Sequence, residues 1–349
     1  MAKLGSCSSE IAEITIDGVT QYTSGDINIY RIPVENFPNS FTNDYLILDR
    51  EASLVDVGFD AEKSRADLER GFEIINKKFN DSIGLEEVSH IIVTHGHIDH
   101  CGMLNYPKLK GRRLYIHELD IGVIENFDEE SSCWIEQMTR LVREAGWDIC
   151  LEGAFFATQF TVGPGDYDLI RLKDGDEIIN GYKVCHIPGH APGMICLEVG
   201  GLVFLGDHML SSTTPHQSPK SHGGAGLQAY LDSLKKVAGR ESRLGLPAHG
   251  DTIHKVKERV LELENFHQQR LDELAEMCGI QKSLGQLTTE YYRRHPELMA
   301  SASNKGFSEE SNWILALDEI AAHVEYLLEH NRIEITGADH GVMRYRSTS

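Results

Sequence analysis

The stretch that decides the fold is Thr94-His95-Gly96-His97-Ile98-Asp99-His100-Cys101-Gly102. It places three imidazoles and one carboxylate within six positions, directly after the apolar run from Val88 to Val93. Such a run predicts a strand buried on both faces, and a loop at a strand end is where a rigid scaffold presents functional groups. One histidine in such a loop is as often a packing residue as a ligand. Four donors this close together predict a metal site.

Three further donors follow, each in a glycine-containing turn at the end of a predicted strand. They are His190 in Ile187-Pro188-Gly189-His190, Asp207 in Phe204-Leu205-Gly206-Asp207 and His249 in Leu246-Pro247-Ala248-His249-Gly250. Glycine allows the close backbone approach that a site assembled from several loops requires. Together with the first cluster, these residues supply seven nitrogen and oxygen donors, enough for two divalent metal ions that share one carboxylate.

The rest of the first 254 residues mixes strands and helices. Short β-rich runs between Ile14 and Val57 predict an antiparallel meander, and a charged helical stretch covers Ala61 to Phe79. Helical periodicity between Glu118 and Thr161 predicts an insert, after which strand signals resume from Leu169 to Leu205.

The pattern after His254 is helical. Three helices and a hairpin from Ile333 to Tyr345 predict a small C-terminal domain of winged-helix type. We therefore expect two domains, 1–254 and 255–349, with the helical insert at about 118–161. The length of 349 residues agrees with two domains.

Composition narrows the class of protein. The 33 Lys+Arg and 54 Asp+Glu residues give a net charge of -21, which argues against nucleic-acid or anionic-membrane binding. No run approaches 18 apolar residues, so no membrane span is expected. Seven scattered cysteines without a Cys-x-x-Cys pair suit a reducing cytoplasm.

The ordered motifs resemble those of the metallo-β-lactamase superfamily. The ligand pattern His95-x-His97-x-Asp99-His100, His190, Asp207 and His249 has the order of that family, and Val55-Asp56-Val57-Gly58 is similar to its Asp-x-Gly turn. The resemblance implies an α+β fold, an αβ/βα sandwich of two mixed sheets with helices outside and the metals at one sheet edge.

The resemblance also implies a role for each ligand. His95, His97 and His190 would hold one metal, Asp99, His100 and His249 the second, and Asp207 would bridge them. Two metal ions about 3.5–4 Å apart share and activate a hydroxide, which would attack the substrate, while Asp99 orients the water or accepts its proton. Asp207 and Asp99 are thus the expected catalytic carboxylates. Asp56 is expected to accept a hydrogen bond from the ligand loop rather than to bind metal.

Departures from particular branches favour a hydrolase. Flavodiiron-type members carry Glu where this chain has His97, and zinc β-lactamases generally lack a bridging carboxylate at Asp207. We therefore expect a dinuclear hydrolase of an ester or thioester, such as an acyl-CoA or glutathione conjugate. The alternatives are a phosphodiesterase or ribonuclease of the same fold, a mononuclear iron persulfide dioxygenase, and a ligand-binding or signalling member with little turnover.

The metals and the substrate are less constrained. Zinc is favoured, with iron and manganese as alternatives, because the same His/Asp set accepts all three. The substrate is expected to be a small molecule, and His208, next to Asp207, is a candidate to contact it.

The C-terminal part has no recognisable substrate code. His267-Gln268-Gln269-Arg270 is similar to a His-x-x-Arg pair of the lactamase-β-like endoribonucleases. The acidic balance of residues 255–349 argues against phosphate binding there, so this part is expected to form a lid or a homodimer contact.

Overall fold

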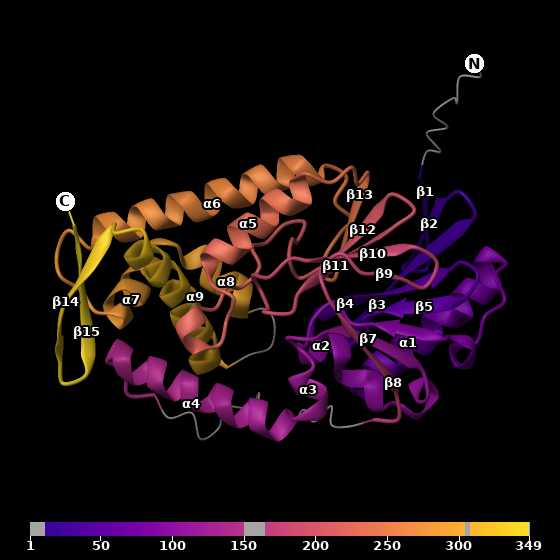
Figure 1. Ribbon diagram of the computed structural model, residues 1–349, viewed down its shortest axis with the longest axis horizontal. Helices are drawn as coiled ribbons and strands as arrows, with labels where there is room; N and C mark the ends of the chain where they lie inside the picture. Colours follow the sequence, from indigo (N-terminus) through magenta and orange to yellow (C-terminus); the bar gives the residue numbers. More distant parts are fainter. Residues whose placement is uncertain (1–10, 150–164, 304–307, 349) are drawn as a thin grey trace, which may run out of the picture.

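The computed structural model describes residues 11–149, 165–303 and 308–348. Part of the helical insert expected at about 118–161 lies outside these residues, including Phe155, Phe156 and Phe160, whose pattern favours a helix core over a pocket wall. Two sheets packed face to face occupy one end of the molecule, and helices gather at the other (Figure 1).

The first sheet has eight strands in sequential order. They are β1 (Ala12–Ile16), β2 (Val19–Ser24), β3 (Ile27–Phe37), β4 (Ser40–Leu48), β5 (Ala52–Val55), β6 (His90–Ile92), β7 (Arg113–His117) and β8 (Asp168–Leu172). Strands β1 to β5 pair antiparallel, which confirms the predicted meander, whereas β5 to β8 pair parallel. Strand β7 is an addition to the elements expected from the sequence.

The second sheet has five strands in the order β13-β12-β11-β10-β9. They are β9 (Glu177–Ile178), β10 (Tyr182–His186), β11 (Ile195–Val199), β12 (Leu202–Gly206) and β13 (Leu244–Pro247). Alternating apolar side chains of both sheets, among them Tyr45, Ile92, Leu197 and Phe204, fill the layer between them. Tyr45 and Phe204 meet edge to face at 5.2 Å between ring centroids.

Helices cover both outer faces. On the first sheet lies α1 (Glu62–Ile74), which continues as a π-helical turn over Ile75–Phe79. The remaining helices are α2 (Ile98–Cys101), α3 (Gly122–Glu125), α4 (Phe127–Ala145), α5 (Leu227–Ala238), α6 (Val256–Met277), α7 (Leu284–Arg294), α8 (Pro296–Ser303) and α9 (Glu309–Glu329). The hairpin of β14 (Ile333–Asp339) and β15 (Val342–Ser347) closes the far end, as predicted (Figure 1).

The C-terminal helices share a core with the second sheet. One hydrophobic cluster joins Val203 and Leu205 of β12 to Leu234 of α5, Leu263 of α6 and Leu317 of α9. Helix α4 of the insert enters the same cluster. The cluster therefore crosses the expected boundary at residue 254, and the division into two domains and the winged-helix type stay predictions.

None of the helices among the described residues combines the length and apolar character needed to cross a bilayer.

Candidate metal centre

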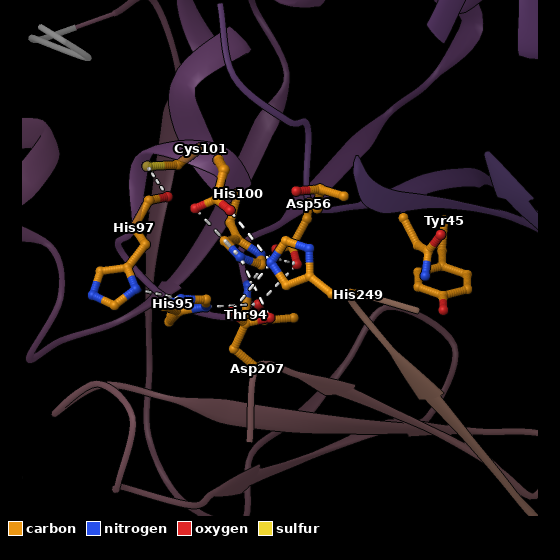
Figure 2. A network of polar contacts seen from close by, with 12 residues as sticks. Tyr45, Asp56, Thr94, His95, His97, His100, Cys101, Asp207 and His249 are labelled. Atoms are coloured by element: carbon orange, nitrogen blue, oxygen red, sulfur yellow. Dashed lines mark hydrogen bonds and ion pairs between the residues drawn. The ribbon is translucent and has the colours of Figure 1, made fainter. Parts of the chain in front are cut away.

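Strand ends bring the predicted donors to one edge of the sandwich. His95 follows β6, and α2 begins three residues later, carrying Asp99 and His100. The other three donors, His190, Asp207 and His249, follow β10, β12 and β13. Figure 2 shows the rings of His95, His100 and His249 gathered above Asp207, with His97 beside His95 and Asp56 beside His100.

The seven predicted ligands form three overlapping groups whose donor atoms lie within 4.8 Å of one another. The groups are His95, His97 and His190; His95, His100 and Asp207; and Asp99, His100 and His249. The first and third correspond to the two metal sets expected from the sequence.

The first group places ring nitrogens face to face. Nδ1 of His97 lies 2.9 Å from Nε2 of His95 and 2.9 Å from Nε2 of His190. Nδ1 of His190 donates to the backbone oxygen of His216 at 2.8 Å. A neutral imidazole carries one proton, so Nε2 of His190 presents a lone pair to His97.

Thr94 sets the orientation of His95 in the same way. Its hydroxyl donates to Oδ2 of Asp56 at 2.8 Å, and its Oγ1 lies 3.2 Å from Nδ1 of His95. Because the hydroxyl proton is engaged, Nδ1 of His95 is the donor of that contact, and its Nε2 also turns a lone pair inward. The one proton that Nδ1 of His97 can carry serves only one of the Nε2 atoms of His95 and His190 well, so the other lone pair is left for a cation.

The second and third groups mix imidazoles with carboxylates. Nδ1 of His100 donates to Asp56 at 2.9 Å, and Nδ1 of His249 donates to the backbone oxygen of Phe41 at 2.6 Å. Nε2 of His249 then faces Asp207 at 3.2 Å and Asp99 at 3.3 Å. Within the described part of the chain, Nε2 of His100 and Oδ1 of Asp207 are buried without a hydrogen-bond partner.

The pKa values differ between the two ends of the cluster. Burial and the facing His97 ring lower the pKa of His190 to about 3. Burial also acts to lower the pKa of His249, but the carboxylates of Asp207 and Asp99 raise it to about 10. The region between these carboxylates therefore attracts positive charge, and a divalent cation would fit there in place of the proton.

Other residues predicted from the sequence have different surroundings. Asp56 accepts hydrogen bonds from Thr94 and His100, the position expected for it. His208 is fully buried, and its ring lies against Tyr230 at 5.1 Å. Burial lowers the pKa of His208 to about 3. This placement does not favour substrate contact, which stays a prediction for His208.

Asp120 is a residue of the site that sequence reasoning missed. Its carboxylate accepts the backbone N–H of Gly96 at 2.8 Å and that of Gly193 at 2.6 Å. It thereby joins the loop of His95 and His97 to the loop of His190. The position of Asp120 could have indicated this role, because Asp120 follows β7. Strands β6 and β7 are parallel neighbours, so their ends lie at the same edge of the sheet.

The His267-x-x-Arg270 pair lies inside the helical layer. Arg270 is 2% exposed and pairs with Glu319 and the hydroxyl of Tyr291. His267 is fully buried, and its Nδ1 lies 3.0 Å from Nε2 of His323. The pair is therefore part of the packing between α6 and α9.

Comparison with known protein families supports the geometric interpretation. The model of the family described as the metallo-beta-lactamase superfamily matches residues 38–249. The chain is 23% identical over 267 residues to the probable metallo-hydrolase YqjP of Bacillus subtilis, which covers 71% of this chain and 78% of that protein. It is 28% identical over 179 residues to the atrochrysone carboxyl ACP thioesterase AacuM of Aspergillus aculeatus, covering 50% of this chain and 41% of that protein. The chain therefore spans less than half the length of the fungal relative.

Two solved structures share the fold. A metallo-beta-lactamase family protein from Thermus thermophilus has a TM-score of 0.74 at 24% identity, covering 91% of this chain and 98% of that chain. A beta-lactamase domain protein from Burkholderia ambifaria has a TM-score of 0.71 at 21% identity, covering 94% of this chain and 93% of that chain. Since these alignments cover nine-tenths of the chain, the likeness extends into the C-terminal helices.

Proposed function

The chain belongs to the metallo-β-lactamase superfamily, and from this premise we propose that it is a dinuclear metal-dependent hydrolase of a small ester or thioester. One observation carries the proposal. In His190, His100 and His249, Nδ1 donates a hydrogen bond to a neighbouring oxygen, which leaves Nε2 of each ring free to face the centre. Such secondary hydrogen bonds fix the tautomer and orientation that a metal ligand needs.

The donor set fits two divalent cations. His95, His97 and His190 would hold one, Asp99, His100 and His249 the other, and Asp207 lies between the two sets. Its Oδ1 is 3.7 Å from His100 and its Oδ2 is 3.7 Å from His190. Bound metal ions of this kind lower the pKa of water toward neutrality and stabilise developing negative charge. A nitrogen and oxygen donor set admits zinc, iron or manganese, and we propose zinc.

Asp99 is the residue best placed to handle a proton. Its side chain is partly exposed and lies 3.3 Å from His249 and 3.6 Å from His100. Burial would raise its pKa, but His100 and His249 hold the pKa of Asp99 far below its usual range. The carboxylate is therefore ionised, oriented by two imidazoles, and able to accept a hydrogen bond from an attacking water.

The substrate class rests on the relatives. The thioesterase AacuM supports ester or thioester cleavage, and YqjP supports a hydrolase. The His267-x-x-Arg270 pair, which suggested phosphodiester cleavage, is buried and offers no surface to a phosphate chain. A cytoplasmic location remains part of the proposal, supported by the free state of all five cysteines in the described part of the chain.

The test combines metal analysis with a substrate panel. We expect about two metal ions per chain and hydrolysis of acyl-CoA or glutathione thioesters. Asp207→Asn should lower turnover by at least about 100-fold, because even indirect supports of a metal site are worth about 10–100-fold. Asp251→Asn is the matched control, since this carboxylate follows His249 by two residues but its side chain is 93% exposed.

Each outcome decides between functions. Full activity and metal content in Asp207→Asn would overturn the proposed centre. One iron per chain with no hydrolysis would favour the dioxygenase alternative. A small molecule that remains bound to the protein through purification, with no turnover of any substrate, would favour a binding protein.

A further inference from the structure

The loop over residues 211–226 makes hydrogen bonds both to the proposed metal ligand His190 and to helix α9. The backbone oxygen of His216 accepts the hydrogen bond from Nδ1 of His190 at 2.8 Å. The side chain of the same His216 contacts a different element, because its Nε2 donates to Oδ2 of Asp318 on α9 at 2.9 Å. Ser218 donates its hydroxyl to the same oxygen. One residue of the loop thus contacts both His190 and α9.

Asp318 is an unusual residue for a helix interior. It is 3% exposed, and its Oδ1 has no hydrogen-bond partner among the described residues. Burying a carboxylate is costly unless its hydrogen bonds compensate, and an apolar residue of similar size often stabilises such a position more. The bonds that Asp318 makes are directed to the loop, so its contribution is expected in the placement of that loop.

A second carboxylate on the same face of α9 provides an internal comparison. Glu325 lies two helical turns after Asp318, and it accepts the backbone N–H groups of Lys220 at 2.8 Å and Ser221 at 2.9 Å. It therefore fastens the same loop to the same helix. Its contacts lie four and five residues beyond His216, whose backbone oxygen accepts the hydrogen bond from His190.

We propose that Asp318 is a positioning residue for the metal ligand His190, acting through His216. By holding the imidazole of His216, Asp318 fixes the backbone oxygen that keeps the proton on Nδ1 of His190. Nε2 of His190 is then left to face His97 and His95. The inference rests on the proposed metal centre, and it gives the C-terminal helices a role in assembling that centre.

The test measures metal binding by the full-length chain. Asp318→Ala is expected to weaken one of the two zinc equivalents by about 10–100-fold, the usual cost of losing an indirect support of a metal ligand. With Co²⁺ in place of zinc, its visible absorption spectrum should change because the ligand geometry changes. Asp318→Asn keeps the shape and one acceptor oxygen, so it should restore most of the affinity.

The control separates positioning from simple anchoring of the loop. Glu325→Ala removes a comparable contact between α9 and the loop, and we expect it to lower the thermal midpoint while zinc affinity and the Co²⁺ spectrum stay unchanged. If Glu325→Ala weakens zinc binding as much as Asp318→Ala does, Asp318 is a general anchor and the inference is wrong.

A double-mutant cycle keeps the proposal testable if Asp318→Ala folds poorly. His216→Ala and Asp318→Leu each remove one end of the hydrogen bond between the two side chains, and leucine is an apolar residue of similar size. The double variant should therefore lose little more zinc affinity than the worse single variant. Independent, multiplying losses would contradict the coupling.

Failure of the two proposals can be told apart. If the wild type binds two zinc ions and hydrolyses its substrate while Asp318→Ala matches it in affinity and spectrum, only the present inference fails. If the wild type binds no zinc at all, the proposed function fails and this inference falls with it.

Discussion

Asp120 shows how one carboxylate can hold two ligand-bearing loops together. Both of its oxygens accept backbone N–H groups, and a methyl group added at Gly193 would lie 2.5 Å from its side chain. Burial raises the pKa of Asp120 to about 6, against the two N–H groups that favour the ionised form. The approach of the two loops therefore depends on the size and the charge of this side chain.

Asp120→Asn should destabilise the protein and weaken metal binding. The amide keeps one acceptor oxygen, but its NH₂ group would face a backbone donor, and an unsatisfied buried donor costs about 1–3 kcal/mol. Urea unfolding and zinc titration would measure both effects. Asp176→Asn is the control, because Asp176 also accepts a backbone N–H, that of Lys173, but in an exposed setting. If Asp120→Asn and Asp176→Asn lower the free energy of unfolding by equal amounts, the role of Asp120 is contradicted.

The sequence indicated the side-chain donors of the site but not its backbone partners. The spacing around His95 and the turns at His190, Asp207 and His249 carry residue identities that can be recognised. The oxygens that orient His190 and His249 belong to the backbones of His216 and Phe41. A backbone oxygen is present at every residue, so only the folded geometry identifies these two.

At the scale of elements, α1 lies close to β3 at a glycine. A Cβ atom added at Gly71 would lie 2.3 Å from Cγ2 of Ile32. An alanine in a helix interior is favoured over glycine by about 1 kcal/mol, whereas overpacking a core costs about 1–3 kcal/mol. Because Ile32 is buried in the same cluster and has little room to move, the packing cost should exceed the gain in helix propensity.

Gly71→Ala is therefore expected to lower the free energy of unfolding by about 1 kcal/mol, measured by urea denaturation. Arg70→Ala is the matched control on the exposed side of α1 and should change it by less than about 0.5 kcal/mol. A stabilised Gly71→Ala variant would mean that Ile32 moves aside.

The packing of α6 against α9 should make stability depend on pH. Burial and the nearby Arg270 lower the pKa of His323 to about 3. The unfolded chain binds a proton at this residue near pH ~6.5, so between about pH 6.5 and 3 the unfolded state holds more protons than the folded state. The stability is fully present above the unfolded-state pKa and is lost as the pH falls.

His323→Gln should remove part of this loss, roughly 2 kcal/mol between pH 7 and 5 for one histidine. Urea unfolding at the two pH values would measure the change. His340→Gln is the control, because the His340 side chain is 96% exposed. An unchanged pH slope in His323→Gln would show that the ring of His323 accepts a proton in the folded state.

Periodicity predicts some elements better than others. The apolar spacing in α9 and the alternation in β14 and β15 are long enough to identify these elements. Helix α8 is not predicted, because Pro296 indicates the end of the preceding helix. Proline is equally suited to the first position of a new helix, where its missing N–H has no intrahelical partner, and α8 begins at that residue.

At the scale of the molecule, the sandwich and its outer helical layers follow from the family, whereas the shared core does not. The sequence changes from mixed to helical character at residue 254, which predicts a domain boundary there. The apolar residues of α6 and α9 pack on the same cluster as β12. The change in hydrophobic pattern shows where the strands stop. It does not show which face of the second sheet the following helices cover.

Removing metal should lower the stability of the whole chain. Metal ions that bind only the folded state at about 100 times their dissociation constant add about 2.7 kcal/mol, and each kcal/mol moves the thermal midpoint of a large domain by about 2–4 °C. A chelator should therefore lower the midpoint by roughly 5–10 °C, and zinc should restore it. Asp207→Asn should respond less, and an equal response would place the stabilising metal elsewhere.

The contacts between the two sheets join segments that lie far apart in the sequence, and this has a consequence for synthesis on the ribosome. The backbone N–H of Asn43 in β4 donates to the oxygen of Ala248, and its side chain donates to Pro247 across a separation of 204 residues. His95, His97, Asp99 and His100 are synthesised early and form an incomplete set of the proposed ligands. His249 reaches them only when the contacts of Asn43 with Pro247 and Ala248 form. Uptake of the two proposed metal ions should therefore lag helix formation in a refolding experiment, as it would while the chain leaves the ribosome.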